Sequence, residues 1–446
     1  MAALKTVYDT MGFLGMTHLH VCMILIALFL AFLAIFKKYE PLLLLPLSMG
    51  ILIANIPAAG LSAYSFRWVE TNYLSSMDEG TLFAVRTMLA NGAATIKETI
   101  QLDSGVLAAV REMVQLDDGT LVVIKETTQQ RGLMNFLYQG ILLVIYPPLI
   151  FLCLGAMTDF GPLIANPKVA IIGLGGQLGI FVALAISYWL AILLEPVTGF
   201  RFTLMEAAAI GIIGSSDGPT SIYSATRLAP HLLPSIAIAA FSYMALVPFI
   251  QPPIMRLLTT AKERVIIMPE PKEVTQKQKI FFPVIMMLIT FFIFPAASAL
   301  IGMLMIGNII RESGVTQRFV PTLQTELLNI LTLIMGLCIG ASATADRFLK
   351  PQTLIIIFSG LLAFVFGTIG GMLTAKLLCW ITKGKINPLI GNSGVSAMPM
   401  AARISQKLGQ QYNPQSHLLM HAMGPIVAST IGSAMVAGVF ISFFLK

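Results

Sequence analysis

The sequence predicts an all-α polytopic membrane protein with about eleven transmembrane helices. Its 446 residues are 57% hydrophobic and only 11% charged, whereas soluble domains carry about 25% charged residues. Several apolar runs reach the roughly 20 residues that cross a bilayer. In addition, short segments rich in small residues recur in the same order in both halves of the chain, which indicates an internal duplication.

Charge and cysteine content exclude several other classes of protein. The net charge of +7 lies mainly in short loops, which is ordinary for a membrane protein and gives no indication of nucleic-acid binding. The four cysteines lie inside apolar runs without CxxC spacing, so neither a disulfide framework nor a zinc site is expected. The apolar run 19–36 ends at Lys37-Lys38 and lacks a small-residue cleavage site, so we interpret it as a true span and not as a signal peptide.

The duplication is supported by several separate matches. Residues 152–156 reappear as 337–341, and 49–56 resemble 301–309 when one gap is allowed. Farther along, 213–216 with Arg227 match 390–393 with Arg403. The alternative is chance similarity between helices rich in small residues, but the matches keep one order along the chain.

These matches divide the chain into four parts. We expect an extra N-terminal span in 1–40, a first repeat in 41–258, a basic linker in 259–282 and a second repeat in 283–446. The expected spans of the two repeats are 41–57, 136–157, 168–194, 204–228 and 231–258, then 283–311, 324–343, 353–380, 386–408 and 416–445. An odd number per copy inverts the second repeat, as in many secondary transporters, whose site lies where two broken helices meet at the midplane.

The segment 67–132 interrupts the first repeat and is too polar to cross a membrane. We expect a water-facing insertion, with a short amphipathic helix at 106–115 and a strand at 120–125. The basic loop 262–279 is expected at the opposite side of the membrane from Arg311, Lys383 and Lys385.

The most informative stretch lies around Asp217, between apolar segments that place this carboxylate at membrane depth. A charge there costs roughly 2.5 to 3.5 kcal/mol, so an intramembrane carboxylate indicates function. Gly218-Pro219 should break the helix and free oxygen atoms to bind Na⁺ or H⁺. The alternative is a structural Asp that caps the second half-helix, and a capping carboxylate could also bind a cation.

The matching stretch 387–403 holds amides, hydroxyls, two glycines and two prolines, but no acidic counterpart of Asp217. One carboxylate with neutral oxygen donors suits a monovalent cation, because calcium sites usually carry several carboxylates. Alternatively, Ser393 and Ser396 only let helices approach closely. Arg403 either pairs with a substrate carboxylate or anchors a helix end. Tyr243 either reaches the ion site or a proton path, or simply satisfies a buried carbonyl.

Longer motifs carry a resemblance to a known family. They are Asp217-Gly218-Pro219-Thr220 and the segments 394–403, 419–425, 40–46, 155–163 and 250–255. Across nearly the whole chain, the sequence resembles the β subunit of the sodium-pumping biotin-dependent decarboxylases, and most of all that of oxaloacetate decarboxylases.

The resemblance implies an enzyme subunit of the bacterial cytoplasmic membrane. It would decarboxylate carboxybiotin on a carrier domain, consume a proton and export Na⁺. Implied partners are an α subunit with carboxyltransferase and biotin carrier, a small membrane γ subunit, further copies of the chain and lipid, and no nucleic acid. By motif, Na⁺ would bind to Asp217, Asn387, Gly391 and Ser396, and catalysis would use Asp217, Tyr243 and Arg403, with Arg403 also holding carboxybiotin.

Two other functions remain open from the residues alone. A cation-coupled secondary transporter of a small anion would have the same repeats and the same intramembrane Asp217. A passive membrane anchor for a soluble enzyme would need neither the broken helices nor Asp217.

Overall fold

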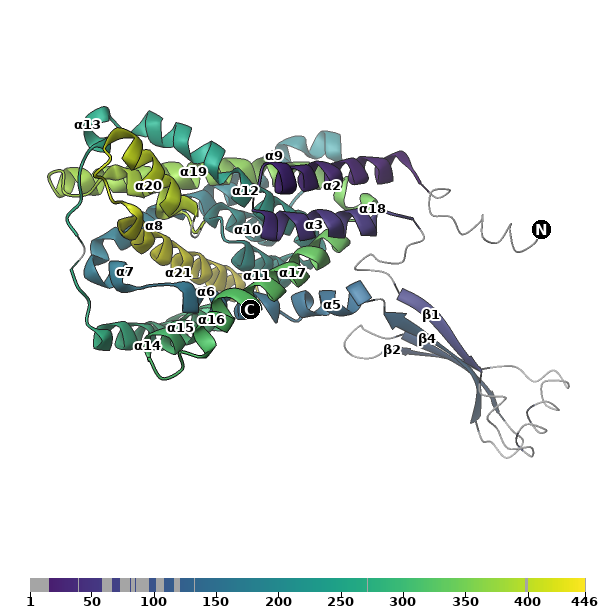
Figure 1. Cartoon of the computed structure of the whole chain (residues 1–446). Helices are drawn as coiled ribbons and strands as arrows, with labels where there is room; N and C mark the ends of the chain where they lie inside the picture. The colour runs from purple at the N-terminus through teal and green to yellow at the C-terminus, as the bar shows by residue number, and fades with distance from the viewer. Residues whose placement is uncertain are drawn as a thin grey trace.

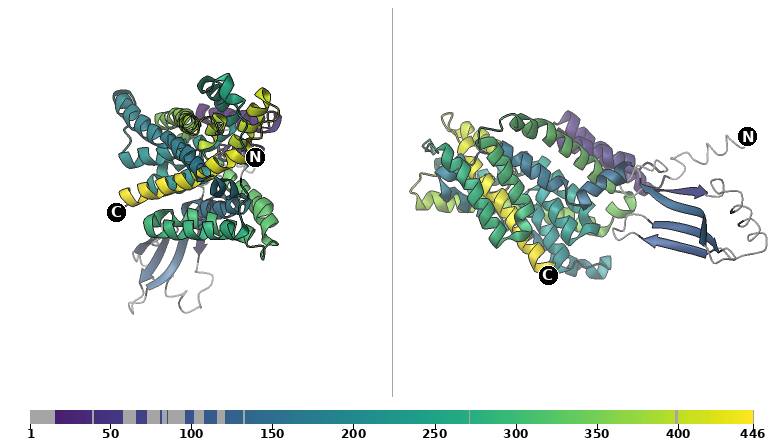
Figure 2. Two further views of the ribbon diagram at one scale, coloured as in Figure 1. Left: turned by 90° about the vertical axis from the view of Figure 1, so that its left-hand side faces the viewer. Right: turned by 90° about the horizontal axis from the view of Figure 1, so that it is seen from below.

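A computed structural model describes residues 16–38, 40–57, 66–72, 81, 85, 96–101, 108–115, 121–131, 133–270, 272–397 and 400–445. In these residues, a body of roughly parallel and antiparallel helices carries a small β-sheet at one end (Figures 1 and 2). The helices of the first half are α2 His18–Phe36, α3 Pro41–Ala54, α5 Leu133–Leu142, α6 Tyr146–Met157, α7 Gly161–Ala165, η3 Pro167–Val169, α8 Ala170–Gly176, α9 Leu178–Thr198, α10 Leu204–Gly211, η4 Ile212–Ser215, α11 Gly218–Leu228, η5 Pro230–Leu232, α12 Leu233–Leu258 and α13 Ala261–Arg264. Those of the second half are α14 Gln276–Ile293, η6 Pro295–Ala297, α15 Ser298–Glu312, α16 Phe319–Thr322, η7 Leu323–Leu327, α17 Leu328–Ser342, α18 Ala345–Phe348, α19 Pro351–Ile381, η8 Pro388–Gly394, α20 Met400–Tyr412 and α21 Leu419–Phe444.

The helical body has the length and composition of a polytopic membrane protein. Among the described residues, 6 helices are long and apolar enough to cross a bilayer, or up to 8 if each of two bent helix pairs is one span. The bent pairs are α5 with α6 and the two parts of α12, with bends of 68° and 58°. Large apolar side chains remain exposed along these helices, for example Phe292 on α14 and Trp380 on α19, as expected for surfaces that face lipid.

The expected single span at 283–311 is wrong. The structure divides this stretch into α14 and α15, which pack against each other, and Phe294 and the short turn Pro295–Ala297 lie between them. The apolar run 280–310 is longer than the roughly 20 residues that one crossing requires, and Pro295 provides the break because its ring cannot continue the first helix.

The helix breaks at both matched stretches are confirmed, but neither stretch is a crossing. His231, just after α11, lies 2.7 Å from Glu206 at the start of α10, so both ends of 204–228 lie together. The ends of the second stretch also lie together, because Asn387 donates to the Ile266 carbonyl at 2.8 Å and Asn413 donates to the neighbouring Val265 carbonyl at 3.2 Å. Both stretches are therefore re-entrant hairpins, and the expected full spans 204–228 and 386–408 are wrong.

The structure also changes the expected side of the basic linker. Lys279 bonds to Asp159 at 3.2 Å, and Lys376 lies 3.7 Å from Glu263. Lys262 and Lys383 line one surface pocket. The linker therefore lies at the same end of the molecule as Lys383, and its expected place on the opposite side is wrong. The expectation failed because 283–311 was counted as one crossing, whereas the structure has two helices there, and the second crossing brings the chain back to the side of the linker. We call this the basic end, defined by Lys262, Lys279, Arg311, Lys383 and Lys385.

Two helix crossings hold the halves of the chain together: α3 packs on α17, and α6 packs on α15. Glycine permits each close approach, because a Cβ on Gly340 would lie 2.1 Å from the Leu47 carbonyl oxygen and one on Gly155 would lie 2.0 Å from that of Leu304. An asparagine closes each crossing: Asn55 donates to the Ala343 carbonyl at 2.8 Å, and Asn308 to the Thr158 carbonyl at 2.7 Å. The segments that resemble each other in the two halves of the sequence therefore make the same kinds of contact in the structure.

The polar insertion contributes a four-stranded antiparallel sheet in the order β1-β4-β3-β2. Its strands are β1 Phe66–Asn72, β2 Ile96–Gln101, β3 Ala108–Gln115 and β4 Leu121–Arg131. It extends beyond the helical body at the end opposite α13 and α20 (Figure 1). The expected strand at 120–125 is confirmed by β4. The expected helix at 106–115 is wrong, because β3 pairs on both sides, with β2 and β4, and this pairing outweighs a helical pattern in so short a segment.

Candidate functional site

The tips of the two hairpins meet inside the protein. At the first tip, Ser216 has left-handed backbone with φ 58°, and Asp217 is the N-cap of α11. Gly218 and Pro219 are the first residues of α11. Proline is favoured in this first turn because the backbone N–H groups there have no partner within the helix, so the N–H that proline lacks is not needed. The backbone N–H of Ser396, in the second tip, donates to the Ser215 carbonyl at 2.8 Å. The two tips, about 180 residues apart in the chain, therefore form one structural unit. Many transporter sites are likewise built where two broken helices meet.

Asp217 is only 4% exposed and accepts three hydrogen bonds. The Thr220 hydroxyl donates to Oδ2 at 2.7 Å, the Ser433 hydroxyl donates to Oδ2 at 3.0 Å, and the Thr220 N–H donates to Oδ1 at 3.4 Å. In the described part of the chain, no Lys, Arg or His forms an ion pair with this carboxylate. Asp217 thus does cap α11, as the structural alternative expects, and its buried carboxyl group has no cationic partner among the described residues.

Helix α21 links both tips through residues that the sequence analysis missed. Ser433 bonds to Asp217, while Thr430, one turn earlier, lies 2.5 Å from the Ser396 hydroxyl. Residues three positions apart share one face of a helix. The available signal was a polar stripe, Ser429, Thr430 and Ser433, inside an otherwise apolar span.

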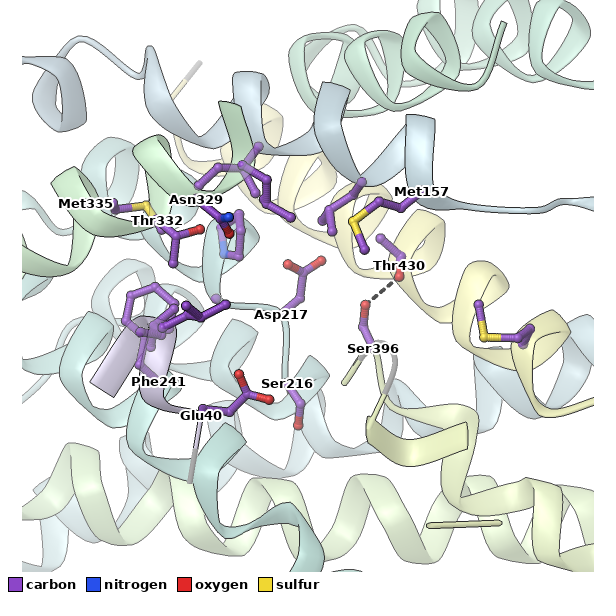
Figure 3. A pocket seen from close by; sticks show the side chains of 18 residues that line it. Glu40, Met157, Ser216, Asp217, Phe241, Asn329, Thr332, Met335, Ser396 and Thr430 are labelled. Atoms are coloured by element: carbon purple, nitrogen blue, oxygen red, sulfur yellow. Dashed lines mark hydrogen bonds between the residues drawn. The ribbon is translucent and has the colours of Figure 1, made fainter. Parts of the chain in front are cut away.

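A cavity of about 330 Å³ lies beside Asp217 (Figure 3). One wall comes from the hairpin tips and α21, with Ser216, Asp217, Ser396 and Thr430. The other wall comes from the start of α3, the end of α6 and the first half of α17. The polar lining residues of this second wall are Glu40, Asn329 and Thr332. The cavity therefore separates the hairpins from the α3–α17 and α6–α15 crossings.

Two other expected cation ligands lie away from this cavity. Asn387 caps η8 by accepting from the Leu389 N–H at 2.9 Å, and its amide nitrogen donates to the linker carbonyls of Arg264 and Ile266. Gly391 lies against α19, where a Cβ would come within 2.7 Å of the Gly371 carbonyl oxygen. Of the four expected ligands, the structure brings Asp217 and Ser396 to one cavity.

The two remaining site residues have different surroundings. Tyr243 is buried, and its hydroxyl donates to the Ile357 carbonyl of α19, which is the contact expected from a structural tyrosine. Arg403 is exposed on α20, one turn after the helix begins, so its guanidinium is accessible to a ligand.

The donor set favours a small hard cation. No group of three or more His, Cys, Asp or Glu side chains that could hold a metal ion is found in the residues that the structure describes. Asp217 is surrounded by neutral hydroxyls, and such oxygen donors around one carboxylate suit a monovalent ion better than a divalent one.

Comparison with known proteins decides the family. Residues 19–444 match the β subunit of Na⁺-transporting oxaloacetate decarboxylase. The chain belongs to this family. Relatives of the β-subunit family align over essentially their whole length. An oxaloacetate decarboxylase β chain of Salmonella typhi is 45% identical over 100% of both chains, and the methylmalonyl-CoA decarboxylase β subunit of Propionigenium modestum is 44% identical over 99% of both.

A third relative, the oxaloacetate decarboxylase β chain of Klebsiella pneumoniae, is 45% identical over 97% of both chains. Family membership and the apolar helices together identify this β subunit as a multi-pass protein of the bacterial cytoplasmic membrane. The unpaired carboxylate of Asp217 thus lies in a subunit whose family is described as Na⁺-transporting.

Proposed function

We propose that this chain decarboxylates carboxybiotin presented by a carrier domain and couples this reaction to Na⁺ export, as the membrane subunit of a Na⁺-translocating decarboxylase. The observation that carries the proposal is Asp217, a buried carboxylate without a protein cation, in a chain that matches the Na⁺-transporting β subunits along its whole length. The same hairpins would also suit a transporter of a small anion. The relatives of this chain are named as decarboxylase subunits, however, which favours the decarboxylase.

Asp217 and Ser396 are the proposed centre of Na⁺ binding. Their support is the shared cavity and the bonds that Ser433 and Thr430 make to them. Asn387 and Gly391 enter the proposal through the family resemblance. In the described arrangement, they hold the second hairpin against the linker and α19, so they would bind Na⁺ only after the hairpin has moved.

Arg403 is the proposed partner of the carboxybiotin carboxylate, because an exposed guanidinium fork fits that group. In the reaction, the bond between the biotin nitrogen and the carboxyl carbon breaks, CO₂ leaves, and the nitrogen takes up a proton. Tyr243 is proposed to act near the path of that proton. Coupling requires that the binding of Na⁺ and the binding of carboxybiotin both shift the equilibrium between the same two conformations.

We also propose that 18–258 and 276–444 are inverted repeats. Each half contains one re-entrant hairpin before its last long helix, and α2 packs on α3 as α14 packs on α15. The matched glycine crossings and the matched bonds of Asn55 and Asn308 are further support. In this arrangement α2 belongs to the first repeat.

The basic end is the proposed cytoplasmic side, because loops rich in Lys and Arg remain in the cytoplasm. The α subunit with its biotin carrier would approach there, near Arg403, and the sheet of the insertion would face the other side of the membrane (Figure 1). A small γ subunit and further copies of this chain are proposed as membrane partners.

Oxaloacetate is the proposed substrate of the whole complex, although relatives that act with methylmalonyl-CoA are almost as similar to the chain. The test is to tag this chain, purify it with its natural partners, and assay the complex. A biotin-carrying polypeptide should copurify, and CO₂ release from free carboxybiotin should require Na⁺. A complex without a biotinylated chain, or carboxybiotin turnover that is equal in choline and Na⁺, would refute the proposal.

A further inference from the structure

A second carboxylate faces the cavity from the wall opposite Asp217. Glu40 ends the connection between α2 and α3, and it lines the same cavity of about 330 Å³. Of the 18 lining residues, only Glu40 and Asp217 have acidic or basic side chains. Figure 3 shows both side chains directed into this space from different elements.

The carboxylate of Glu40 is not used for local structure. Glu40 occupies the N-cap of α3, yet its side chain accepts no capping hydrogen bond, unlike an acidic residue that stabilises a helix start. Its backbone is left-handed, with φ 37°, a conformation that residues other than glycine adopt infrequently. Within the described part of the chain, no hydrogen bond or ion pair holds this carboxylate, so it remains available to a ligand.

Ser216 offers a matching oxygen. Its hydroxyl is buried, and no hydrogen-bond partner for it is found among the described residues. Ser216 lines the cavity beside Asp217, and Figure 3 shows its side chain on the Glu40 side of the tip. Buried hydroxyls almost always have a partner, so one without a partner beside a cavity that also holds two carboxyl groups indicates a bound ion or water.

The cavity wall that carries Glu40 is linked to the basic end of the molecule. Met157, on the same cavity wall, has its carbonyl bonded by Arg311 of the basic end at 2.9 Å. Glu40 is half-buried and directly precedes the first residue of α3. One wall of the cavity is therefore joined directly to a residue of the basic end.

We propose that Glu40 and Ser216 form a second position for a monovalent cation, through which Na⁺ passes between the basic end and Asp217. This inference rests on the proposed function, since it adds a step to the path of the same ion. A carboxylate and a hydroxyl without protein partners supply hard oxygen ligands, and water completes the shell of a small cation in a cavity of this size.

The test uses the purified complex with two substitutions and a control. Glu40→Gln removes the charge and keeps the shape, whereas Ser216→Gly removes the hydroxyl and tolerates the left-handed backbone. Glu326→Gln removes an exposed carboxylate that does not line the cavity. Decarboxylation rates are measured against Na⁺ at constant ionic strength, with choline as the replacement.

Glu40→Gln should raise the half-saturating Na⁺ concentration about tenfold, and Ser216→Gly severalfold, with maximal rates kept within about twofold. Glu326→Gln should match the unsubstituted complex. Coincident Na⁺ curves for Glu40→Gln and the unsubstituted complex would overturn the inference.

If a variant is inactive, its binding of Na⁺ can still be measured. Thermal unfolding of the complex at increasing Na⁺ concentration reports binding without turnover. The stabilisation by Na⁺ should require more Na⁺ in Glu40→Gln, and an unchanged dependence would overturn the inference. Failure of the proposed function is distinct, because the unsubstituted complex would then lack Na⁺-dependent turnover.

Discussion

The backbone N–H of Ser396 donates a 2.8 Å hydrogen bond to the carbonyl oxygen of Ser215, and this bond joins the tips of two hairpins. The hairpins enter the helical body from opposite ends, since the ends of the second lie at the basic end and those of the first do not (Figure 1). Asp217 follows directly after the first tip. Any movement of one hairpin relative to the other therefore changes the surroundings of this carboxylate.

Ser396→Ala should raise the Na⁺ concentration that half-saturates decarboxylation by about three- to tenfold, because it removes a hydroxyl from the cavity wall. The backbone bond to Ser215 remains, so the hairpins should stay joined. Ser393→Ala is the matched control, since Ser393 is equally buried but bonds to Asn392 away from the cavity. An unchanged Na⁺ titration in Ser396→Ala would count against ligation.

Ser433→Ala should weaken Na⁺ binding through Asp217. Hydrogen bonds to charged groups contribute about 1.5–3 kcal/mol, so the half-saturating Na⁺ concentration should change by about tenfold or more. Na⁺-dependent CO₂ release by the purified complex is the measurement. Ser429→Ala on the same helix, where the hydroxyl accepts from Gln177, serves as the control. Equal effects of the two variants would indicate general damage to α21 and contradict a specific link to Asp217.

Tyr243→Phe separates chemistry from packing. If Tyr243 acts near the proton path, the maximal rate should fall at least about tenfold while the Na⁺ requirement stays constant. If its hydroxyl only satisfies the Ile357 carbonyl, the variant should lose roughly 1 kcal/mol of stability and keep its rate. Steady-state kinetics and thermal unfolding of the same preparation distinguish the two results, and the second would remove Tyr243 from the catalytic group.

Gly155→Ala and Gly340→Ala should destabilise the protein similarly, by about 1–3 kcal/mol each, because each new Cβ would overlap a backbone carbonyl. Gly302→Ala is the control, since its Cβ would meet only the ring of Phe291 at 3.1 Å, which can shift. Unfolding temperatures of the three variants in detergent provide the comparison. A stable Gly340→Ala protein beside an unstable Gly155→Ala protein would contradict the equivalence of the two crossings.

Local sequence was sufficient for the class of protein and for the break at Asp217. Apolar length predicts helices that cross a bilayer, and Gly218-Pro219 predicts an interruption. A break alone does not determine whether the chain continues across the membrane or turns back. That choice depends on contacts such as His231 with Glu206, which no local pattern contains. The side assigned to the linker was wrong because it depended on the count of crossings.

Only part of the candidate site was predicted, because local sequence patterns again do not contain the tertiary contacts. Asp217 and Ser396 could be found because polar residues are conspicuous in apolar surroundings. Ser433 lies 216 residues from Asp217, so its role became visible only in the fold. Asn387 stands in the same polar stretch as Ser396, but the amide bonds that hold it to the linker depend on tertiary structure.

The central claim is that Asp217 binds the transported Na⁺, and ²²Na⁺ uptake into proteoliposomes that contain the complex tests it most directly. With carboxylated substrate supplied, the unsubstituted complex should accumulate ²²Na⁺. Asp217→Asn, inserted and assembled at the same level, should lose at least about 99% of both uptake and Na⁺-dependent decarboxylation. Uptake by Asp217→Asn at a rate close to that of the unsubstituted complex would contradict the account.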